Sequence, residues 1–250
     1  RISMALLLSV ASCALLAQDV ASPSPPAQRV VGEGVTGTLL RHAQFPSRHV
    51  AARNVDVWLP PGYDEAKDAR YPVLYMHDGQ NVFDPSTSYT RVDWGVDEAM
   101  TRLIGNGHVR QAIVVAVWNT PKRLQEYMPR KAIQGESFIP TPGDPPFPTA
   151  EIVADDYLAF LATELKPFID AQYRTLTGPS DTFVMGSSMG GLISAYAVME
   201  FPHVFGGAGC VSTHWPIAGG IVEDYVATHL PAPGRHRFYF DYGTEAIDAQ

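Results

Sequence analysis

The sequence predicts an α/β fold: a mostly parallel central sheet with helices on both faces. Two observations lead to this fold class. Short apolar runs typical of strands alternate with segments whose apolar residues recur at helical spacing. The chain has 250 residues, 46% hydrophobic and 18% charged, which is enough to bury one sizeable core. We therefore expect one folded domain, over residues 31–250.

Six segments have the length and composition of strands: residues 54–59, 71–76, 112–118, 182–185, 206–211 and 237–242. The first of them alternates polar and apolar residues, which predicts a strand with one exposed face. The second and third are continuous apolar runs, which is typical of strands buried on both faces. Helical spacing of apolar side chains predicts helices over residues 92–104, 157–168 and 192–199.

The N-terminal segment is expected to be a signal peptide, residues 1–17, because residues 4–17 form an apolar run of secretory length. Residues 18–30 follow as a Pro/Ser-rich linker. A buried first helix is the alternative interpretation of the apolar run. Residues 10–13 also resemble a lipoprotein processing box, but the apolar run continues past Cys13, so lipid anchoring is less favoured. We expect a secreted or periplasmic protein.

Composition argues against several classes of partner. The formal net charge of −8 and the isoelectric point near 5.4 give no electrostatic footprint for nucleic acid. The apolar run at residues 4–17 is too short to span a bilayer comfortably, so no stable membrane insertion is expected. Once a signal peptide is removed, Cys210 has no partner for a disulfide and no cysteine cluster for zinc exists. Nothing in the sequence indicates the oligomeric state.

The most informative motif is GSSMGG at residues 186–191, which contains G-x-S-x-G with Ser188 at its centre. It follows a predicted strand and opens a predicted helix, the context in which this motif marks a nucleophilic serine. The serine must stand at the tip of a tight, strained turn, where side chains at Gly186 and Gly190 would collide. Ser187 is the nearest rival nucleophile, but it lacks the symmetric flanking glycines.

Two backbone N–H groups are expected to stabilise the oxyanion of a tetrahedral intermediate. The Met189 N–H lies at the start of the helix that follows Ser188. The second donor is expected from the HDGQN motif at residues 77–81, which follows a predicted strand. Gln80 is the preferred donor there and Gly79 the alternative. His77 is expected to support this loop through a hydrogen bond.

Residues 119–148 are long and rich in proline and glycine, and we expect them to run over the surface beside the cleft. Two interpretations of the residues at the start of this segment stay open. Trp118, Arg123, Glu126 and Tyr127 could contact substrate. Alternatively, an Arg–Glu ion pair could hold the segment in place.

On these motifs the sequence resembles the putative-esterase branch of the α/β hydrolases, which includes enterochelin-esterase-like, feruloyl and acetyl-xylan esterases and the related mycolyltransferases. The matching stretches are residues 54–63, 71–84, 118–129, 165–175, 184–197 and 240–248. The G-x-S-x-G motif alone is common to many hydrolases, whereas HDGQN together with R-x-x-E-Y, starting at Arg123, is more specific. The resemblance implies an α/β-hydrolase fold and an ester substrate, often of a sugar or a siderophore.

A catalytic serine needs a histidine to take its proton and an acid to orient that histidine. In this fold the chain order is serine, acid, histidine. Asp248 and Glu245 both follow the strand at residues 237–242, and the resemblance favours Asp248; Asp241 lies too early, within the strand. All eight histidines precede Asp248, so we expect the domain to be truncated at its C-terminus, with the base beyond Gln250.

The sequence therefore predicts a secreted serine carboxylic-ester hydrolase that works through an acyl-enzyme on Ser188, without a metal or organic cofactor. Its expected partner is a small-molecule or glycan ester. His214 and Trp215, which follow the strand at residues 206–211, and Trp118 are the expected substrate contacts. An acyltransferase on the same scaffold and a non-catalytic module that binds glycans or siderophores are the alternatives.

Overall fold

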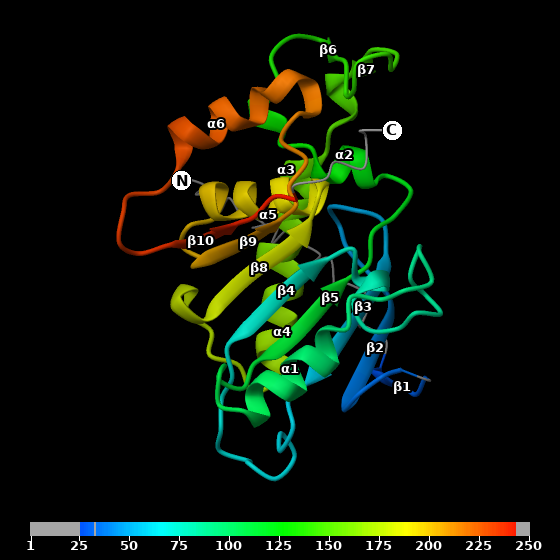
Figure 1. Ribbon diagram of the computed structural model, residues 1–250, viewed down its shortest axis with the longest axis vertical. Coiled ribbons are helices and arrows are strands. Elements are labelled where there is room, and N and C mark those ends of the chain that lie inside the picture. Colours follow the sequence, from blue (N-terminus) through cyan, green and yellow to red (C-terminus); the bar gives the residue numbers. More distant parts are fainter. Residues whose placement is uncertain (1–25, 33, 244–250) are drawn as a thin grey trace, which may run out of the picture.

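The computed structural model describes residues 26–32 and 34–243 (Figure 1). In this part of the chain the main sheet has eight strands in the order β1-β2-β3-β5-β4-β8-β9-β10. Its strands are β1 (Gln28–Val30), β2 (Thr38–Phe45), β3 (Arg53–Leu59), β4 (Val73–His77), β5 (Ile113–Val117), β8 (Thr182–Ser187), β9 (Gly207–Val211) and β10 (Arg237–Phe240). The predicted signal peptide, Glu245 and Asp248 lie outside the described residues.

The five strands β5, β4, β8, β9 and β10 pair in parallel, whereas β1, β2 and β3 join the sheet in antiparallel pairs. The predicted mostly parallel sheet is confirmed. Because parallel strands share a direction, the segments that follow β4, β5, β8 and β9 all leave the sheet at one edge. This edge carries the motifs that the sequence singles out.

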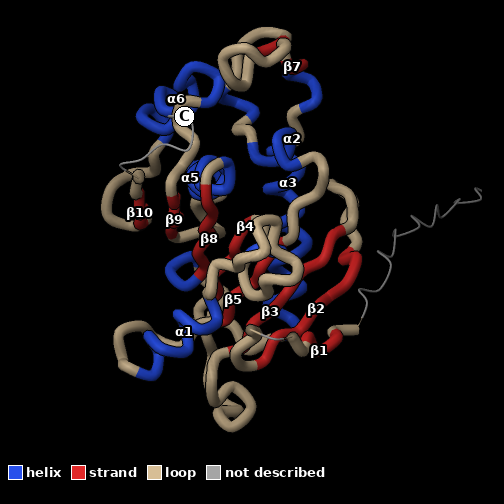
Figure 2. The backbone as a smooth tube through the Cα atoms, turned by 45° about the vertical axis from the view of Figure 1, so that its right-hand side comes forward, coloured by secondary structure: helices blue, strands red, loops and turns tan. Residues whose placement is uncertain are grey.

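Helices cover both faces of the sheet, as predicted (Figure 2). One face packs against α1 (Val96–Gly105) through a cluster that includes Trp58 and Met76. The other face carries the larger core, which includes Tyr75 and Val115. The helices on that side are α2 (Arg123–Tyr127), α3 (Ala154–Ala159), α4 (Lys166–Gln172), α5 (Met189–Glu200) and α6 (Ile221–His229). In Figure 1, α1 lies in front of the strands and α4 behind them.

Strands β1 and β2 were not predicted, and the residues of β1 were assigned to the linker. Both strands are antiparallel and lie at one end of the sheet. The burial of β2 does not follow a regular alternation, because the register shifts between His42 and Phe45. The strand β3 was correctly placed, but it is buried on both faces instead of half exposed. It lies between β2 and β5, and a core cluster covers each of its faces.

Several predicted boundaries were wrong by a few residues. The helix predicted over residues 92–104 begins only at Val96, because Gly95 adopts a left-handed conformation and Val92 is 68% exposed. The helix predicted over residues 157–168 is part of a longer helical run, in which a π-helical segment (Phe160–Leu165) joins α3 to α4. The last predicted strand ends at Phe240 instead of residue 242. Helix α6 was not predicted.

The segment from residue 119 to residue 148 is more structured than expected. It contains α2 and the hairpin strands β6 (Ser137–Phe138) and β7 (Phe147–Pro148). Figures 1 and 2 place this hairpin and α6 together at one end of the molecule. The Ala218 N–H donates to the Pro140 carbonyl at 2.8 Å, which ties the two parts together. No helix among residues 26–32 and 34–243 is long and apolar enough to cross a membrane.

A buried ion pair joins β3 to α2. The Arg53 guanidinium donates two hydrogen bonds to Glu126, at 2.7 and 2.9 Å, and both side chains are almost completely buried. Arg53 also lies over the rings of Tyr157 and Phe160. Bidentate geometry and neighbouring rings compensate the cost of removing both charges from water.

Loss of one partner of this pair should strongly destabilise the fold. Glu126→Gln leaves the Arg53 charge buried without its counter-charge, so we expect the free energy of unfolding to fall by about 3–5 kcal/mol. The measurement is urea unfolding followed by circular dichroism. As a control, Arg48→Gln breaks the pair with Glu164, in which Arg48 is 67% exposed, and should cost at most about 1 kcal/mol. An equal loss of stability in the two variants would contradict the prediction.

Candidate active site

Ser188 lies in a strained turn between β8 and α5. Its backbone angles are φ 58° and ψ −119°, a region that non-glycine residues rarely occupy. The Ser188 N–H donates to the Val211 carbonyl at 3.0 Å, so the adjacent strand β9 holds the turn. Among the described residues, no hydrogen bond involves the Ser188 hydroxyl group. The side chain is partly exposed at the carboxyl edge of the sheet.

The glycines around Ser188 have different roles. A Cβ atom at Gly186 would lie 2.7 Å from the carbonyl carbon and oxygen of Gly190, so only glycine fits there. At Gly190 itself a Cβ atom would make only ordinary contacts, at 3.5 Å, which corrects the expectation of a collision. Gly191 is the second sterically required position, because a Cβ atom there would overlap the side chain of Thr213.

The start of α5 presents backbone N–H groups beside Ser188. Met189 is the first residue of this helix, so its N–H has no carbonyl partner one turn earlier within the helix. The His214 N–H donates to the Ser188 carbonyl at 3.3 Å, which places the segment after β9 next to the turn. The structure therefore brings Ser188, Met189 and the backbone of His214 together.

The HDGQN loop packs against the same turn. Asp78 adopts a left-handed conformation with φ 58°, and residues 79–81 form a short 3₁₀ helix. A Cβ atom at Gly79 would lie 2.6 Å from the Ala116 carbonyl carbon, so this glycine lets the loop approach β5 closely. A Cβ atom at Gly190 would lie 3.5 Å from Oδ2 of Asp78. The loop after β4 and the first turn of α5 are thus in direct contact.

Arg123 holds this loop in place. Its guanidinium donates to both carboxylate oxygens of Asp78, at 2.7 Å each, and lies 3.5 Å from the Ser187 carbonyl. Asn119 donates a further side-chain hydrogen bond to Asp78 at 2.6 Å. The Asp78 N–H donates to the Tyr127 hydroxyl at 3.2 Å. Asn119 and Arg123, both from the segment after β5, therefore bind the buried Asp78 carboxylate, and Arg123 also reaches the end of β8.

The segment that contains Gln80 is also anchored by its own side chain. The Asn119 N–H donates to Oε1 of Gln80 at 3.2 Å, and the Thr87 hydroxyl donates to the Gln80 carbonyl at 2.7 Å. The ion pairs also bear on the two interpretations of the R-x-x-E-Y motif, substrate contact and an Arg–Glu ion pair that holds the segment in place. Arg123 and Glu126 do not pair with each other; each forms an ion pair with a different partner, Asp78 and Arg53.

The predicted substrate contacts lie in different surroundings. Trp118 follows β5, and its indole N–H donates to Asp56 at 2.9 Å, while Arg41 lies over its ring at 4.5 Å. Trp215 packs beside Phe240, with ring centroids 5.8 Å apart. Within the described part of the chain, His214 is the only one of the three that forms a hydrogen bond to the serine turn.

Asp241 lies just beyond β10, outside the strand that was predicted to include it. Its Oδ1 accepts the Ser212 N–H at 2.6 Å. This contact links the end of β10 to the segment that carries His214. The residues that were expected to supply the catalytic acid follow closely, at positions that lie outside the described part of the chain.

His77 is completely buried below the HDGQN loop. Its Nδ1 is 2.9 Å from the Tyr157 hydroxyl, a hydrogen bond of the supporting kind that the sequence predicted. Its Nε2 is buried and has no partner among the described residues. Burial lowers the pKa of His77 from 6.5 to about 4, despite the favourable charge of Asp78. The imidazole is therefore neutral at neutral pH.

This depressed pKa predicts a loss of stability in acid. Between about pH 6.5 and pH 4 the unfolded chain binds a proton at His77 that the folded chain does not bind, so the free energy of unfolding falls with falling pH. The full contribution is about 3 kcal/mol. Urea unfolding across this range should show a shallower pH dependence in His77→Gln. His203→Gln, at an exposed histidine, controls for loss of an imidazole; an unchanged slope in His77→Gln would contradict the assignment.

Comparison with known proteins agrees with this geometry. The sequence family described as "Putative esterase" matches residues 50–219. The "Uncharacterized protein YbbA" of Bacillus subtilis is 24% identical over 205 residues, which cover 80% of this chain and 71% of YbbA. The siderophore hydrolase EstA from Aspergillus nidulans has a similar structure, with a TM-score of 0.60 at 18% identity over 85% of this chain and 70% of EstA.

The IroE-like serine hydrolase from Shewanella oneidensis also has a similar structure, with a TM-score of 0.52 and 24% identity. The match covers 68% of this chain and 49% of that hydrolase, so this chain matches about half the length of that relative. Structural likeness at this level of identity establishes the fold, and the family match over residues 50–219 establishes the family. The chain has the α/β-hydrolase fold and belongs to the putative-esterase family.

Proposed function

We propose that this protein is a serine carboxylic-ester hydrolase in which Ser188 attacks the acyl carbon and forms an acyl-enzyme. The observation that carries the proposal is the backbone of Ser188, held at φ 58° between a parallel strand and the start of a helix. This turn presents the hydroxyl at the carboxyl edge of the sheet, where active sites of open α/β sheets lie. Membership of an esterase family supports the choice of reaction.

The oxyanion of the tetrahedral intermediate would be stabilised by the N–H groups of Met189 and Gln80, with Gly79 as the alternative to Gln80. Two observations support this pair. Met189 begins α5, and the loop that contains Gln80 contacts the first turn of the same helix through Asp78. Preorganised donors of this kind stabilise the developing charge because they need no reorientation during the reaction.

The acid of the triad would be Asp248, with Glu245 as the alternative. This assignment follows from the order serine, acid, histidine in the fold. His214, Trp215 and Trp118 would contact the substrate, and the position of His214 beside the Ser188 carbonyl supports its inclusion.

A carbohydrate- or siderophore-linked ester is the proposed substrate class, and a secreted or periplasmic location fits such a substrate. The structural likeness to EstA, which is named as a siderophore hydrolase, supports the siderophore branch of this proposal. Product analysis with a catecholate-type and a feruloyl-sugar ester would separate the two branches.

Replacing the nucleophile should abolish the chemistry and leave the fold intact. In the full-length protein, Ser188→Ala should lower kcat/KM for p-nitrophenyl acetate by about 10⁴-fold or more and prevent labelling by a fluorophosphonate probe. Ser187→Ala is the matched control on the same turn and should still be labelled. Equal activity in Ser188→Ala and the unmodified protein would refute the proposal, and labelling of Ser187 would reassign the nucleophile.

The contact between Arg123 and Asp78 should affect the rate more than substrate binding. Arg123→Lys keeps the charge but loses the planar, bidentate contact, so the loop that contains Gln80 should shift. We expect kcat to fall by about 10²-fold with little change in KM, because a displaced oxyanion donor acts in the transition state. Arg110→Lys, which alters the exposed pair with Asp181 before β8, is the control. A rise in KM at constant kcat would show that Arg123 binds substrate instead.

A further inference from the structure

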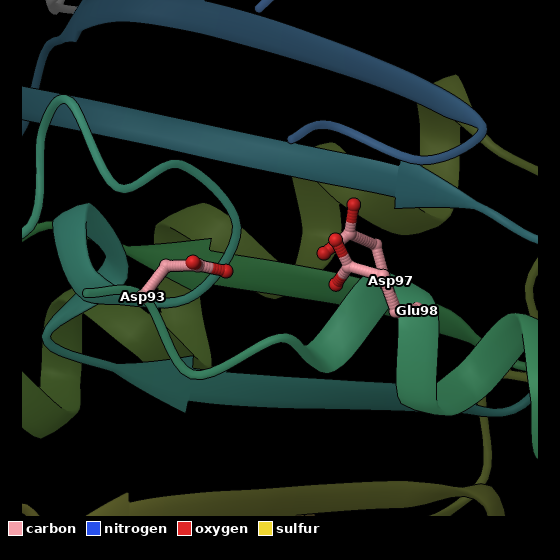
Figure 3. Close-up of side chains that lie close together, drawn as sticks. All are labelled: Asp93, Asp97 and Glu98. Atoms are coloured by element: carbon pink, nitrogen blue, oxygen red, sulfur yellow. The ribbon is translucent and has the colours of Figure 1, made fainter. Parts of the chain in front are cut away.

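Three carboxylates lie close together at the start of α1, on the face of the sheet that this helix covers (Figure 3). Asp93 belongs to the loop before the helix, and Asp97 and Glu98 belong to its first turn. One oxygen of each side chain lies within 4.8 Å of the others. In Figure 3 the Asp93 carboxylate points toward the adjacent carboxylates of Asp97 and Glu98.

The central carboxylate of this cluster, that of Asp97, is fully buried, and only one of its two oxygens has a hydrogen-bond partner among the described residues. Asp97 has no exposed surface. Its Oδ2 accepts the Thr36 N–H at 2.5 Å, but its Oδ1 is buried and has no partner among the described residues. Oε2 of Glu98 is likewise buried without a partner. A buried carboxylate oxygen without a partner is costly, so these two oxygens are candidates for binding a ligand.

No positive side chain compensates the cluster within the described part of the chain, because none of the ion pairs there includes Asp93, Asp97 or Glu98. The Asp93 side chain is anchored independently, since its Oδ2 accepts the Gly95 N–H at 2.9 Å.

We propose that Asp93, Asp97 and Glu98 form a structural site for a divalent cation, and that Ca²⁺ is the ion that fits. The donor set consists of oxygen atoms alone, as Ca²⁺ prefers. With bonds of about 2.3–2.6 Å, one Ca²⁺ ion can bridge oxygens up to about 5 Å apart, so the three carboxylates need little movement. Backbone carbonyls and water would complete the coordination, because the three side chains alone cannot saturate Ca²⁺.

The position of this site indicates what the ion would do. Asp97 already holds the segment before β2 through the Thr36 N–H. On the other side, the Trp94 N–H donates to the Asn81 carbonyl at 2.8 Å, next to Gln80. A cation at this point would fasten three segments of the chain to one another. The ion would stabilise the fold. It would take no part in the serine chemistry, which is expected to need no metal.

The experiment measures Ca²⁺ binding by isothermal titration calorimetry, together with Tm, on full-length protein freed of metal with EDTA. We expect one Ca²⁺ ion per chain and a Tm that rises with Ca²⁺ concentration, because the ion binds only the folded state. The double variant Asp93→Asn/Glu98→Gln should weaken binding by at least about tenfold, because affinity follows ligand charge. Mg²⁺ at equal concentration tests the choice of ion.

A matched control separates a specific site from general attraction of cations to acidic residues. Glu223→Gln/Asp224→Asn removes the same charge from the first turn of α6, where both side chains are exposed. This variant should bind Ca²⁺ like the unmodified protein. Equal weakening in both double variants, or no Ca²⁺-dependent rise in Tm in the unmodified protein, would overturn the proposal; the latter would indicate that Asp97 and Glu98 share a proton instead. Neither readout depends on ester hydrolysis.

Discussion

The bidentate ion pair between Arg123 and Asp78 is the contact on which the geometry of the candidate active site depends. Asp78 follows β4, Arg123 belongs to the segment after β5, and the same guanidinium reaches the carbonyl at the end of β8. Parallel pairing brings these strand ends to one edge, but it does not fix the loops beyond them. The buried carboxylate fixes them, because a buried charge requires its partners in defined positions.

Features that depend on local sterics could be predicted from the sequence. The turn at Ser188 is of this kind: Gly186 has no room for a side chain, and the strand and helix on either side were recognised from short apolar runs. The buried strands β4 and β5 were also recognised, because continuous apolar runs are typical of strands covered on both faces. The loop at Gly79 was expected from its position after a predicted strand, and the resemblance to a known family made the HDGQN motif more specific.

Features that depend on distant partners could not be predicted. Arg53 and Glu126 are 73 positions apart, and nothing local to either residue indicates the pair. The alternation in β3 suggested an exposed face, because the sequence does not reveal that a core cluster covers each face of this strand. Asp97 falls within the helix predicted over residues 92–104, and only the packing of Thr36 and its neighbours shows that it is buried.

The turn at Ser188 depends on residues that are synthesised later. The Ser188 N–H is held by the Val211 carbonyl, and the turn is packed against Thr213 through Gly191. While a ribosome has released the chain only as far as α5, the sequence of the turn is complete. The residues that hold it, Val211 and Thr213, have not yet been synthesised. The strained backbone would then relax to an ordinary conformation. The turn at Ser188 therefore becomes a fixed part of the structure only when β9 joins the sheet beside β8.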